Sequence, residues 1–159
     1  MTDFEGYFQA PIPICGVIGD SQGALFGQGC IEKGMVKATY GTGSSVMMNA
    51  GTEPIMSDLG LVTSLAWGLN GKITYQITDI VEMMKAEDGM TVKELCVDGG
   101  PTRNQYLMKF QSDILGTTVS LPRCEESSAF GAGLMAGLSC GLYKMESIFE
   151  VKNRNQFIP

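Results

Sequence analysis

Residues 16–44 read GVIGDSQGALFGQGCIEKGMVKATYGTGS. This stretch decides the fold, because a short apolar run ends at Gly19 and Asp20 then opens a segment of small and apolar residues with helical spacing. The pattern predicts a strand at residues 14–18 and a helix at residues 21–30, with Asp20 on the turn that joins them. A side chain on such a turn projects into a cleft, so Asp20 is a candidate functional residue.

Two interpretations of Asp20 stay open. Its carboxylate is suited to cap the helix by accepting a hydrogen bond from the backbone amide of Gln22 or Gly23, worth about 1 kcal/mol. Alternatively, it is a general base that takes the proton of a substrate hydroxyl as that hydroxyl attacks a phosphoryl group. The positive end of the helix dipole favours the ionised carboxylate that a base requires.

A second glycine-rich turn, Gly41-Thr42-Gly43-Ser44, follows a predicted strand at residues 35–39. Its backbone amides and two hydroxyls are suited to holding a phosphate. A lone Gly-x-Gly is a weak signal, and the turn fits an ordinary hairpin between its flanking strands as well. A carboxylate and a phosphate cradle this close in sequence nevertheless suggest phosphoryl transfer.

A third turn, Asp98-Gly99-Gly100-Pro101-Thr102-Arg103-Asn104, follows a predicted buried strand at residues 94–97 and opens a helix. This is the place where α/β sheets bind nucleotides. The two glycines permit close approach of the backbone to a ligand. Asn104 is placed either to cap the helix or to hydrogen-bond a base or ribose, and a tight strand-to-helix turn without a ligand explains the residues equally well.

Composition restricts the class of protein. The chain has 159 residues, 44% of them hydrophobic and 18% charged, which excludes a disordered chain and suits one ordinary core. The net charge of −6, with no basic run, argues against a nucleic-acid partner. No stretch approaches the roughly 20 apolar residues of a membrane span, and the first residues do not resemble a signal peptide, so we expect a cytoplasmic protein without a membrane partner.

The cysteine and histidine content argues against a zinc site and against a histidine-dependent active site. The chain has five widely spaced cysteines, no Cys-x-x-Cys pair and no histidine, which removes the common zinc ligands and the usual Ser-His or Cys-His base, and no residue is expected to ligate a metal. Each cysteine has small or apolar neighbours, so all five are expected in the core. They are Cys15, Cys30, Cys96, Cys124 and Cys140.

The hydrophobic periodicity predicts a strand-rich first part and an alternating second part. The first part is expected to be an antiparallel meander with a hairpin turn at residues 68–71, followed by a helix. Its strands are predicted at residues 35–39, 45–49, 61–67 and 72–77, and the helix at residues 78–86. The second part is expected to alternate strand and helix, at residues 94–97, 104–115, 118–121 and 127–139, before a peripheral polar tail at residues 147–159.

Taken together and in this order, the motifs resemble the C-terminal domain of the FGGY carbohydrate kinases and, within that family, its glycerol kinase branch. The resemblance implies that Asp20 is the catalytic base for phosphoryl transfer from ATP to a hydroxyl of a glycerol-like polyol or sugar. It implies phosphate binding at Gly41, Thr42 and Gly43, with Mg²⁺ bridging the phosphates. It also implies adenosine binding at Gly99, Gly100 and Asn104.

The same resemblance implies an α/β fold, one ribonuclease H-like (actin/hexokinase-like ATPase) half-domain with a mixed β-sheet and flanking helices. Residues 1–159 are then a single domain. Its first half, residues 1–76, holds the leading segment, the Asp-bearing turn and the meander, and its second half, residues 77–159, is the β-α-β-α part on the nucleotide side.

Two departures from the family pattern limit the expected activity. The family's N-terminal domain, which carries a further phosphate loop and most contacts to the acceptor, is absent, and an internal segment is missing near Tyr75 and Gln76. We therefore expect weak ATP binding and no kinase activity from this chain alone. The alternative is a non-catalytic, actin-like nucleotide-binding or oligomerisation module that associates through exposed apolar surface, possible as a homo-oligomer.

Overall fold

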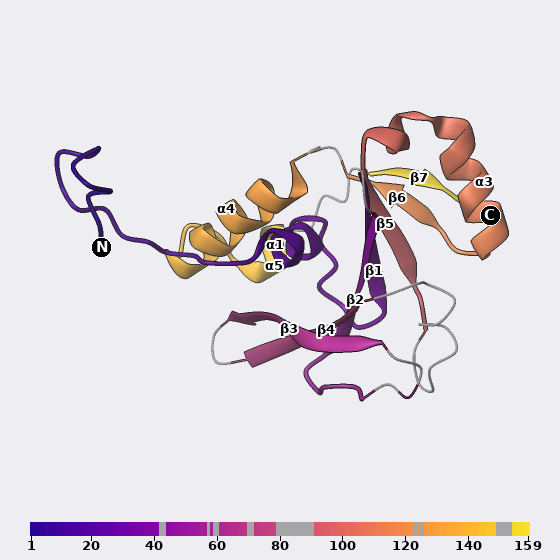
Figure 1. Ribbon diagram of the computed structural model, residues 1–159, viewed down its shortest axis with the longest axis horizontal. Helices are drawn as coiled ribbons and strands as arrows, with labels where there is room; N and C mark the ends of the chain where they lie inside the picture. The colour runs from indigo at the N-terminus through magenta and orange to yellow at the C-terminus, as the bar shows by residue number, and fades with distance from the viewer. Residues whose placement is uncertain are drawn as a thin grey trace.

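The computed structural model describes residues 1–41, 44–56, 58, 61–69, 72–78, 91–122, 124, 126–148 and 154–159, and of residues 72–78 it describes the backbone. Within these residues, one sheet of seven strands has helices on both faces (Figure 1). The sheet contains strands from both halves of the chain. The fold is therefore a three-layer α/β arrangement.

The centre of the sheet is parallel and its flanks are antiparallel. The strands are β1 (Met35–Tyr40), β2 (Ser44–Gly51), β3 (Val62–Leu69), β4 (Lys72–Thr78), β5 (Glu94–Gly99), β6 (Val119–Leu121) and β7 (Asn155–Phe157). Their order is β3-β4-β2-β1-β5-β6-β7, in which β1, β5 and β6 are parallel and the other neighbours antiparallel. Four successive residues are buried in both β1 and β5, as expected for parallel strands covered on both faces.

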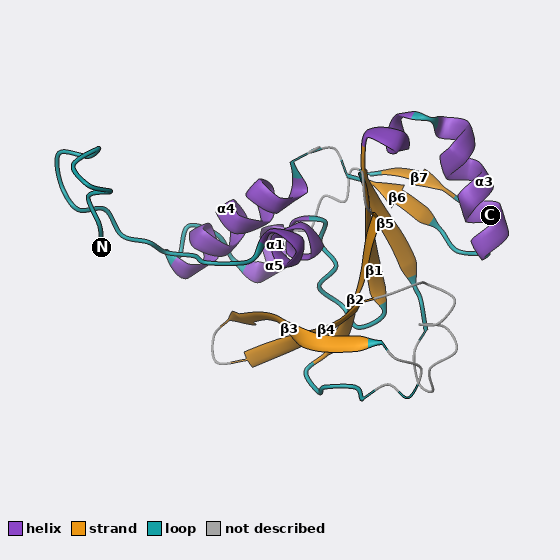
Figure 2. Ribbon diagram, in the orientation of Figure 1, coloured by secondary structure: helices purple, strands orange, loops and turns teal. Residues whose placement is uncertain are grey.

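The helices divide between the two faces. They are α1 (Asp20–Gly27), α3 (Gln105–Leu115), α4 (Ser127–Ser139) and the short α5 (Met145–Ile148), with a 3-10 turn η1 (Gly100–Arg103). Figure 2 shows α1, α4 and α5 on one side of the sheet and α3 on the other. Because strand side chains alternate between faces, Val36 packs in the core that contains Met108 of α3, whereas Met35 packs with Phe26 of α1 and Leu134 of α4.

Glycines let α1 and α4 cross with their backbones in contact. A Cβ atom on Gly131 would lie 1.8 Å from the carbonyl oxygen of Gly23, and one on Gly27 would lie 2.2 Å from that of Ser127. Glycine weakens an isolated helix by about 1 kcal/mol relative to alanine. This close contact with α4, together with the buried Leu25 and Phe26, explains why the glycine-rich segment is nonetheless helical.

Most predicted elements are confirmed, but the predicted meander is wrong in its order. All of its strands are present, yet β4 lies between β2 and β3, so that Met47 of β2 pairs with Thr78 of β4. The connection from Gly51 to Val62 is long enough to carry the chain past one strand position. The helix predicted at residues 78–86 lies outside the described residues except for Thr78, which ends β4, and residues 70 and 71 of the predicted hairpin turn also lie outside them.

The strand predicted at residues 14–18 is also wrong. These residues are not part of any strand, and Figure 1 shows the segment running alongside α4. A Cβ atom on Gly16 would lie 2.9 Å from the backbone nitrogen of Ala136. A strand needs a partner for its backbone hydrogen bonds, and here the neighbour is a helix whose own bonds are already made.

The tail is not peripheral, contrary to the prediction. β7 pairs antiparallel with β6, and the backbone oxygen of Phe157 accepts a hydrogen bond from Ser112 Oγ of α3 at 2.8 Å. Arg154 lies beside Glu94, with Nη1 3.6 Å from Oε2, and also donates to Cys96 Sγ at 2.8 Å. The end of the described chain therefore completes one edge of the sheet.

The expectation for the cysteines holds for two of the five. Cys30 and Cys96 are buried in the core beneath α1, whereas Cys15 and Cys124 are partly buried and Cys140 is exposed. In the described part of the chain, each helix is too short or too polar to cross a membrane.

The α1–α4 contact predicts opposite effects for two alanine substitutions on one helix. Gly131→Ala should destabilise the protein by about 3 kcal/mol or more, because its new methyl group would overlap the backbone of α1. Gly133→Ala is the matched control: it has nothing within 4 Å of the new Cβ atom and should stabilise by about 0.5–1 kcal/mol. Urea unfolding of the two variants measures both effects, and equal stabilities would contradict the close crossing.

Tyr40 should make stability depend on alkaline pH. Its hydroxyl accepts a hydrogen bond from Gln111 Nε2, and burial raises the pKa of Tyr40 above the usual 10.0, partly offset by that hydrogen bond. Above pH 10 the unfolded chain releases the phenol proton while the native protein keeps it, so Tyr40 lowers stability as pH rises. Tyr40→Phe should be less stable by about 1 kcal/mol at pH 7. Unfolding curves should show this gap narrowing above pH 10, and parallel pH profiles would refute the assignment.

Candidate functional site

Two of the predicted glycine turns meet at one edge of the sheet. β1 and β5 run parallel and end together, with Tyr40 paired to Gly99. Gly99 has φ +103°, and a Cβ atom there would lie 2.0 Å from the carbonyl oxygen of Tyr40. Only glycine fits this position. The turn that starts at Gly41 and the turn that starts at Gly99 are therefore neighbours.

Unlike at residue 99, the fold does not require a glycine at residue 100. Its φ is not in the left-handed region, and nothing lies within 4 Å of the position that a Cβ atom would take. The turn is held instead by Thr102, whose Oγ1 donates to the carbonyl oxygen of Gly99 at 2.7 Å. Gly100 thus exposes its backbone to open space at the end of the parallel strands.

Asn104 caps α3, which was one of its two predicted roles. Its side-chain Oδ1 accepts a hydrogen bond from the backbone nitrogen of Leu107 at 3.2 Å. The cap uses only the side-chain oxygen. Because the amide nitrogen takes no part in the cap, capping does not exclude a contact between Asn104 and a ligand.

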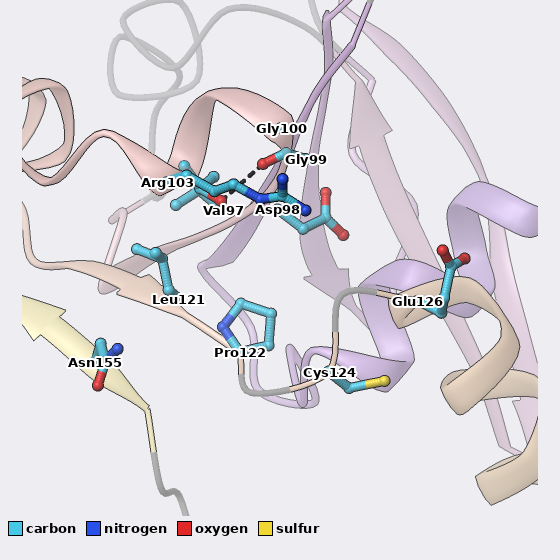
Figure 3. Close-up of a pocket in the computed structure, with 11 residues that line it drawn as sticks. Val97, Asp98, Gly99, Gly100, Arg103, Leu121, Pro122, Cys124, Glu126 and Asn155 are labelled. Atoms are coloured by element: carbon cyan, nitrogen blue, oxygen red, sulfur yellow. Dashed lines mark hydrogen bonds between the residues drawn. The ribbon is translucent and has the colours of Figure 1, made fainter.

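A cleft of about 480 Å³ opens beside the Gly99–Gly100 turn (Figure 3). Its walls come from the end of β5, η1, the end of β6 and the chain leading into α4. The side chains of Asp98, Arg103, Glu126 and Asn155 line it together with the two glycines. Its volume is typical of small-molecule sites, and its place at the carboxyl ends of parallel strands is where α/β sheets bind ligands.

The other predicted phosphate turn borders a different hollow. Gly41 lines an apolar space of about 440 Å³ between the β1–β2 turn and α3, together with Pro101, Leu107 and Phe110. Thr42 and Gly43 lie outside the described residues. The turn at residues 99–101 therefore separates the hollow beside Gly41 from the cleft beside Gly100.

Asp20 is the first residue of α1 and is exposed. The helix is capped by Gly19, whose carbonyl oxygen accepts from the backbone nitrogen of Gly23 at 2.7 Å, and Asp20 Oδ1 accepts only from the adjacent Ser21 nitrogen at 2.6 Å. The alternative in which Asp20 caps the helix through Gln22 or Gly23 is therefore wrong. Its carboxylate faces solvent at the start of the helix.

A buried lysine connects Asp20 electrostatically to the cleft. Lys37 of β1 is 1% exposed, and its Nζ donates to Thr39 Oγ1 at 2.8 Å. Burial lowers the pKa of Lys37, and the negative charges of Asp98 and Asp20 oppose that effect. Sequence analysis missed this residue, although a lysine between buried apolar positions of a central strand is itself a signal, because lysine is rarely buried without a partner.

Gln28 joins the end of α1 to the end of β5. It is fully buried, and its Nε2 donates to Asp98 Oδ2 at 2.7 Å. Asp98 is 6% exposed, and within the described residues neither Asp98 Oδ1 nor Gln28 Oε1 has a hydrogen-bond partner. No local pattern predicts this contact, because its two residues are 70 positions apart in the chain.

Comparison with known proteins finds similarity to one family over part of the chain. Residues 72–140 match the FGGY family of carbohydrate kinases, C-terminal domain. A glycerol kinase from Listeria innocua is 30% identical over 224 aligned positions, which cover 87% of this chain and 45% of the relative. A glycerol kinase from Alkaliphilus oremlandii is 30% identical over 237 positions, which cover 95% of this chain and 47% of the relative. The chain thus spans about half the length of these curated relatives.

The alignment lengths show that this chain lacks residues that the relative has within the aligned region. Since 87% of 159 residues is about 138, about 86 of the 224 positions aligned to the Listeria protein lack a residue of this chain. This agrees with the gap predicted from the sequence, whose location near Tyr75 and Gln76 stays a prediction. In the structure both residues belong to β4, where they pair with Leu65 and Ser64 of β3.

Solved structures share the fold. A crystal structure of Plasmodium falciparum glycerol kinase with ADP superposes with a TM-score of 0.80 at 21% identity, over 91% of this chain and 46% of that one. A xyloylose kinase from Brucella ovis gives 0.75 at 12% identity, over 99% of this chain and 50% of that one. These likenesses confirm the mixed-sheet, actin- and hexokinase-like fold. In sequence, residues 72–140 are similar to the C-terminal domain of the FGGY family of carbohydrate kinases, and in fold the chain is similar to about half of a solved glycerol kinase.

Proposed function

We propose that this chain is the nucleotide-binding part of an ATP-dependent kinase that phosphorylates a hydroxyl group of glycerol or a related polyol or sugar. The observation that carries the proposal is the free space at Gly100. No atom lies within 4 Å of the position that a Cβ atom would take there, and Gly100 lines a 480 Å³ cleft at the carboxyl ends of β1 and β5. A backbone without a side chain at this position permits close approach of a nucleoside. Support for a nucleotide as ligand also comes from the similar Plasmodium falciparum glycerol kinase, which was crystallised with ADP.

The proposed roles follow the order of the sites along the sheet edge. Gly99, Gly100 and the amide of Asn104 face the adenosine, and the turn of Gly41, Thr42 and Gly43 holds phosphates. Support for this order is the pairing of Tyr40 with Gly99, which puts the two turns next to each other. A nucleotide that extends from one turn to the other would cross the boundary between the two hollows.

Asp20 is proposed as the general base. Its exposed carboxylate can accept the proton of an acceptor hydroxyl as that hydroxyl attacks the terminal phosphoryl group. Asp20 is not among the residues that line the cleft beside Gly100, and support for its role comes from its exposed position at the start of α1 and from the resemblance to the family. Transfer further requires that the hydroxyl and the phosphoryl group be aligned and shielded from water, which kinases achieve by domain closure.

Magnesium is proposed as the ion that neutralises the transferred phosphates. Among the described residues there is no group of three or more His, Cys, Asp or Glu side chains that could hold a metal by itself. Mg²⁺ commonly binds through phosphate oxygens and water together with one or two carboxylates, so the phosphates of the bound nucleotide would supply part of its coordination.

A specific surface favours the second candidate function, a non-catalytic oligomerisation module. The outer face of α3 exposes large apolar side chains, with Tyr106 78%, Phe110 50% and Ile114 67% exposed, beside the apolar hollow that Gly41 lines. Such a surface suits association with another protein surface. Light scattering separates the two functions, because a tight dimer without nucleotide affinity favours the module and a monomer that binds nucleotide favours the kinase part.

The two adjacent glycines provide a direct test of nucleotide binding. Gly100→Ala should leave the free energy of unfolding within about 0.5 kcal/mol and weaken ATP binding about tenfold, because the new methyl group would occupy the ligand's space. Gly99→Ala is the destabilising control, since its methyl group would overlap Tyr40. Calorimetric titration with Mg²⁺ and ATP measures binding, and unchanged affinity in the folded Gly100→Ala variant would argue against the proposed site.

The isolated chain should lack kinase turnover. Acceptor contacts and shielding from water are expected from the family's other domain, so a coupled assay with glycerol, xylulose and ATP should give rates far below the roughly 1–100 per second of typical kinases. A rate in that range, lost in Asp20→Asn, would show instead that this chain carries a complete active site. A fully active Asp20→Asn variant would refute Asp20 as the base.

A further inference from the structure

We propose that the Asp98 carboxylate is the acceptor for a ribose hydroxyl of the bound nucleotide, so that Asp98 makes the cleft selective for ribonucleotides. This inference rests on the proposed function and assigns a specificity role to a residue outside the glycine turns. It starts from one carboxylate whose two oxygen atoms have different surroundings. Oδ2 accepts from Gln28 Nε2 at 2.7 Å, whereas Oδ1 has no partner in the described part of the chain.

Asp98 Oδ1 lacks a hydrogen-bond donor among the described residues, and this costs free energy that a bound ligand can recover. Asp98 is 6% exposed, and leaving a buried acceptor without a hydrogen bond costs free energy that a donor would recover. Gln28 is fully buried and fixes the orientation of the carboxylate from the opposite side. The carboxylate is therefore already oriented before any ligand binds.

The remaining oxygen is near the cleft. Asp98 is one of the residues that line it, and in Figure 3 its carboxylate lies in view between the Arg103 guanidinium and the Glu126 side chain. Oδ1 is recessed below the cleft surface, so a donor has to enter this recess to reach it while Gln28 holds Oδ2 in place.

The chemistry of the cleft favours a neutral hydroxyl as that donor. Asp98 and Glu126 are negatively charged and Arg103 is positively charged, so the three charged side chains that line the cleft sum to −1, which favours the uncharged nucleoside over phosphates at this place. A ribose hydroxyl projects from its ring on a single bond and can enter a recess, whereas the amino group of adenine lies in the plane of the base. Acidic side chains accept from ribose hydroxyls in the same way at other α/β sheet edges.

Ligand analogues test the inference on the unmodified 159-residue chain. ATP, 2′-deoxy-ATP, 3′-deoxy-ATP and inosine triphosphate are titrated in turn with Mg²⁺ and followed by ligand-observed NMR, which detects weak binding. ATP should bind about tenfold more tightly than at least one deoxy analogue, the loss expected for one hydrogen bond to a charged acceptor, and about as tightly as inosine triphosphate. Discrimination against inosine triphosphate alone would assign Asp98 to the base and overturn the inference.

Two variants separate a specificity role from a structural one. Asp98→Asn should reduce the ratio between ATP and the deoxy analogue to about one. Glu126→Gln, which removes a charge from the same cleft, should leave the ratio unchanged. Circular dichroism checks that both variants are folded; should Asp98→Asn not fold, the analogue series on the unmodified chain decides alone.

The outcomes also distinguish this inference from the proposed function. Equal binding of ATP and both deoxy analogues would overturn the ribose contact while nucleotide binding stands, and would assign Asp98 Oδ1 to a buried water molecule. The inference would also be overturned if folded Asp98→Asn still bound ATP more tightly than the deoxy analogue. Loss of this preference in Glu126→Gln to the same extent as in Asp98→Asn would overturn it as well. Absence of binding by all four nucleotides would overturn both proposals.

Discussion

The contact on which the candidate site depends is the side-by-side ending of β1 and β5, where Gly99 touches the backbone of Tyr40. A side chain at residue 99 would force the two strands apart, and the turns that follow them would then diverge. Because β1 and β5 are parallel, the backbone leaves both strands at the same edge of the sheet, and a hollow remains beyond that edge. The cleft next to Gly100 therefore results from the parallel direction of the two strands and from the absence of a side chain at Gly99.

The sequence was sufficient where the signal is local. The spacing of apolar residues predicted β1, α3 and α4 to within one or two residues, because β1 is a buried, mostly apolar run and each helix buries one face. The Gly99–Gly100 turn was also predicted, since a buried strand, two glycines and a helix start leave few backbone solutions. Resemblance to a family supplied the proposed roles of Asp20 and Asn104. Local patterns alone left Asp20 open between capping and catalysis, and Asn104 open between capping and ligand binding.

The sequence was insufficient where contacts join distant parts of the chain. A strand at residues 14–18 was expected from composition, but whether an extended segment pairs depends on what lies beside it, and here that neighbour is α4. The same reason explains the misplaced order of β3 and β4 and the unexpected β7. The contact of Gln28 with Asp98, and the burial of Lys37, became visible only when α1 was placed on the sheet.

The parallel pairing of β1 with β5 also bears on the order in which the protein folds. Met35 pairs with Glu94, so the chain must close a long loop before this contact forms, whereas β3 and β4 are joined by a short connection and can pair early. Long-range parallel contacts slow folding, because the entropy of loop closure is lost before the contacts compensate for it. The edge that forms the cleft is thus among the last parts to assemble, and a partly folded chain with intact hairpins would still have no ligand site.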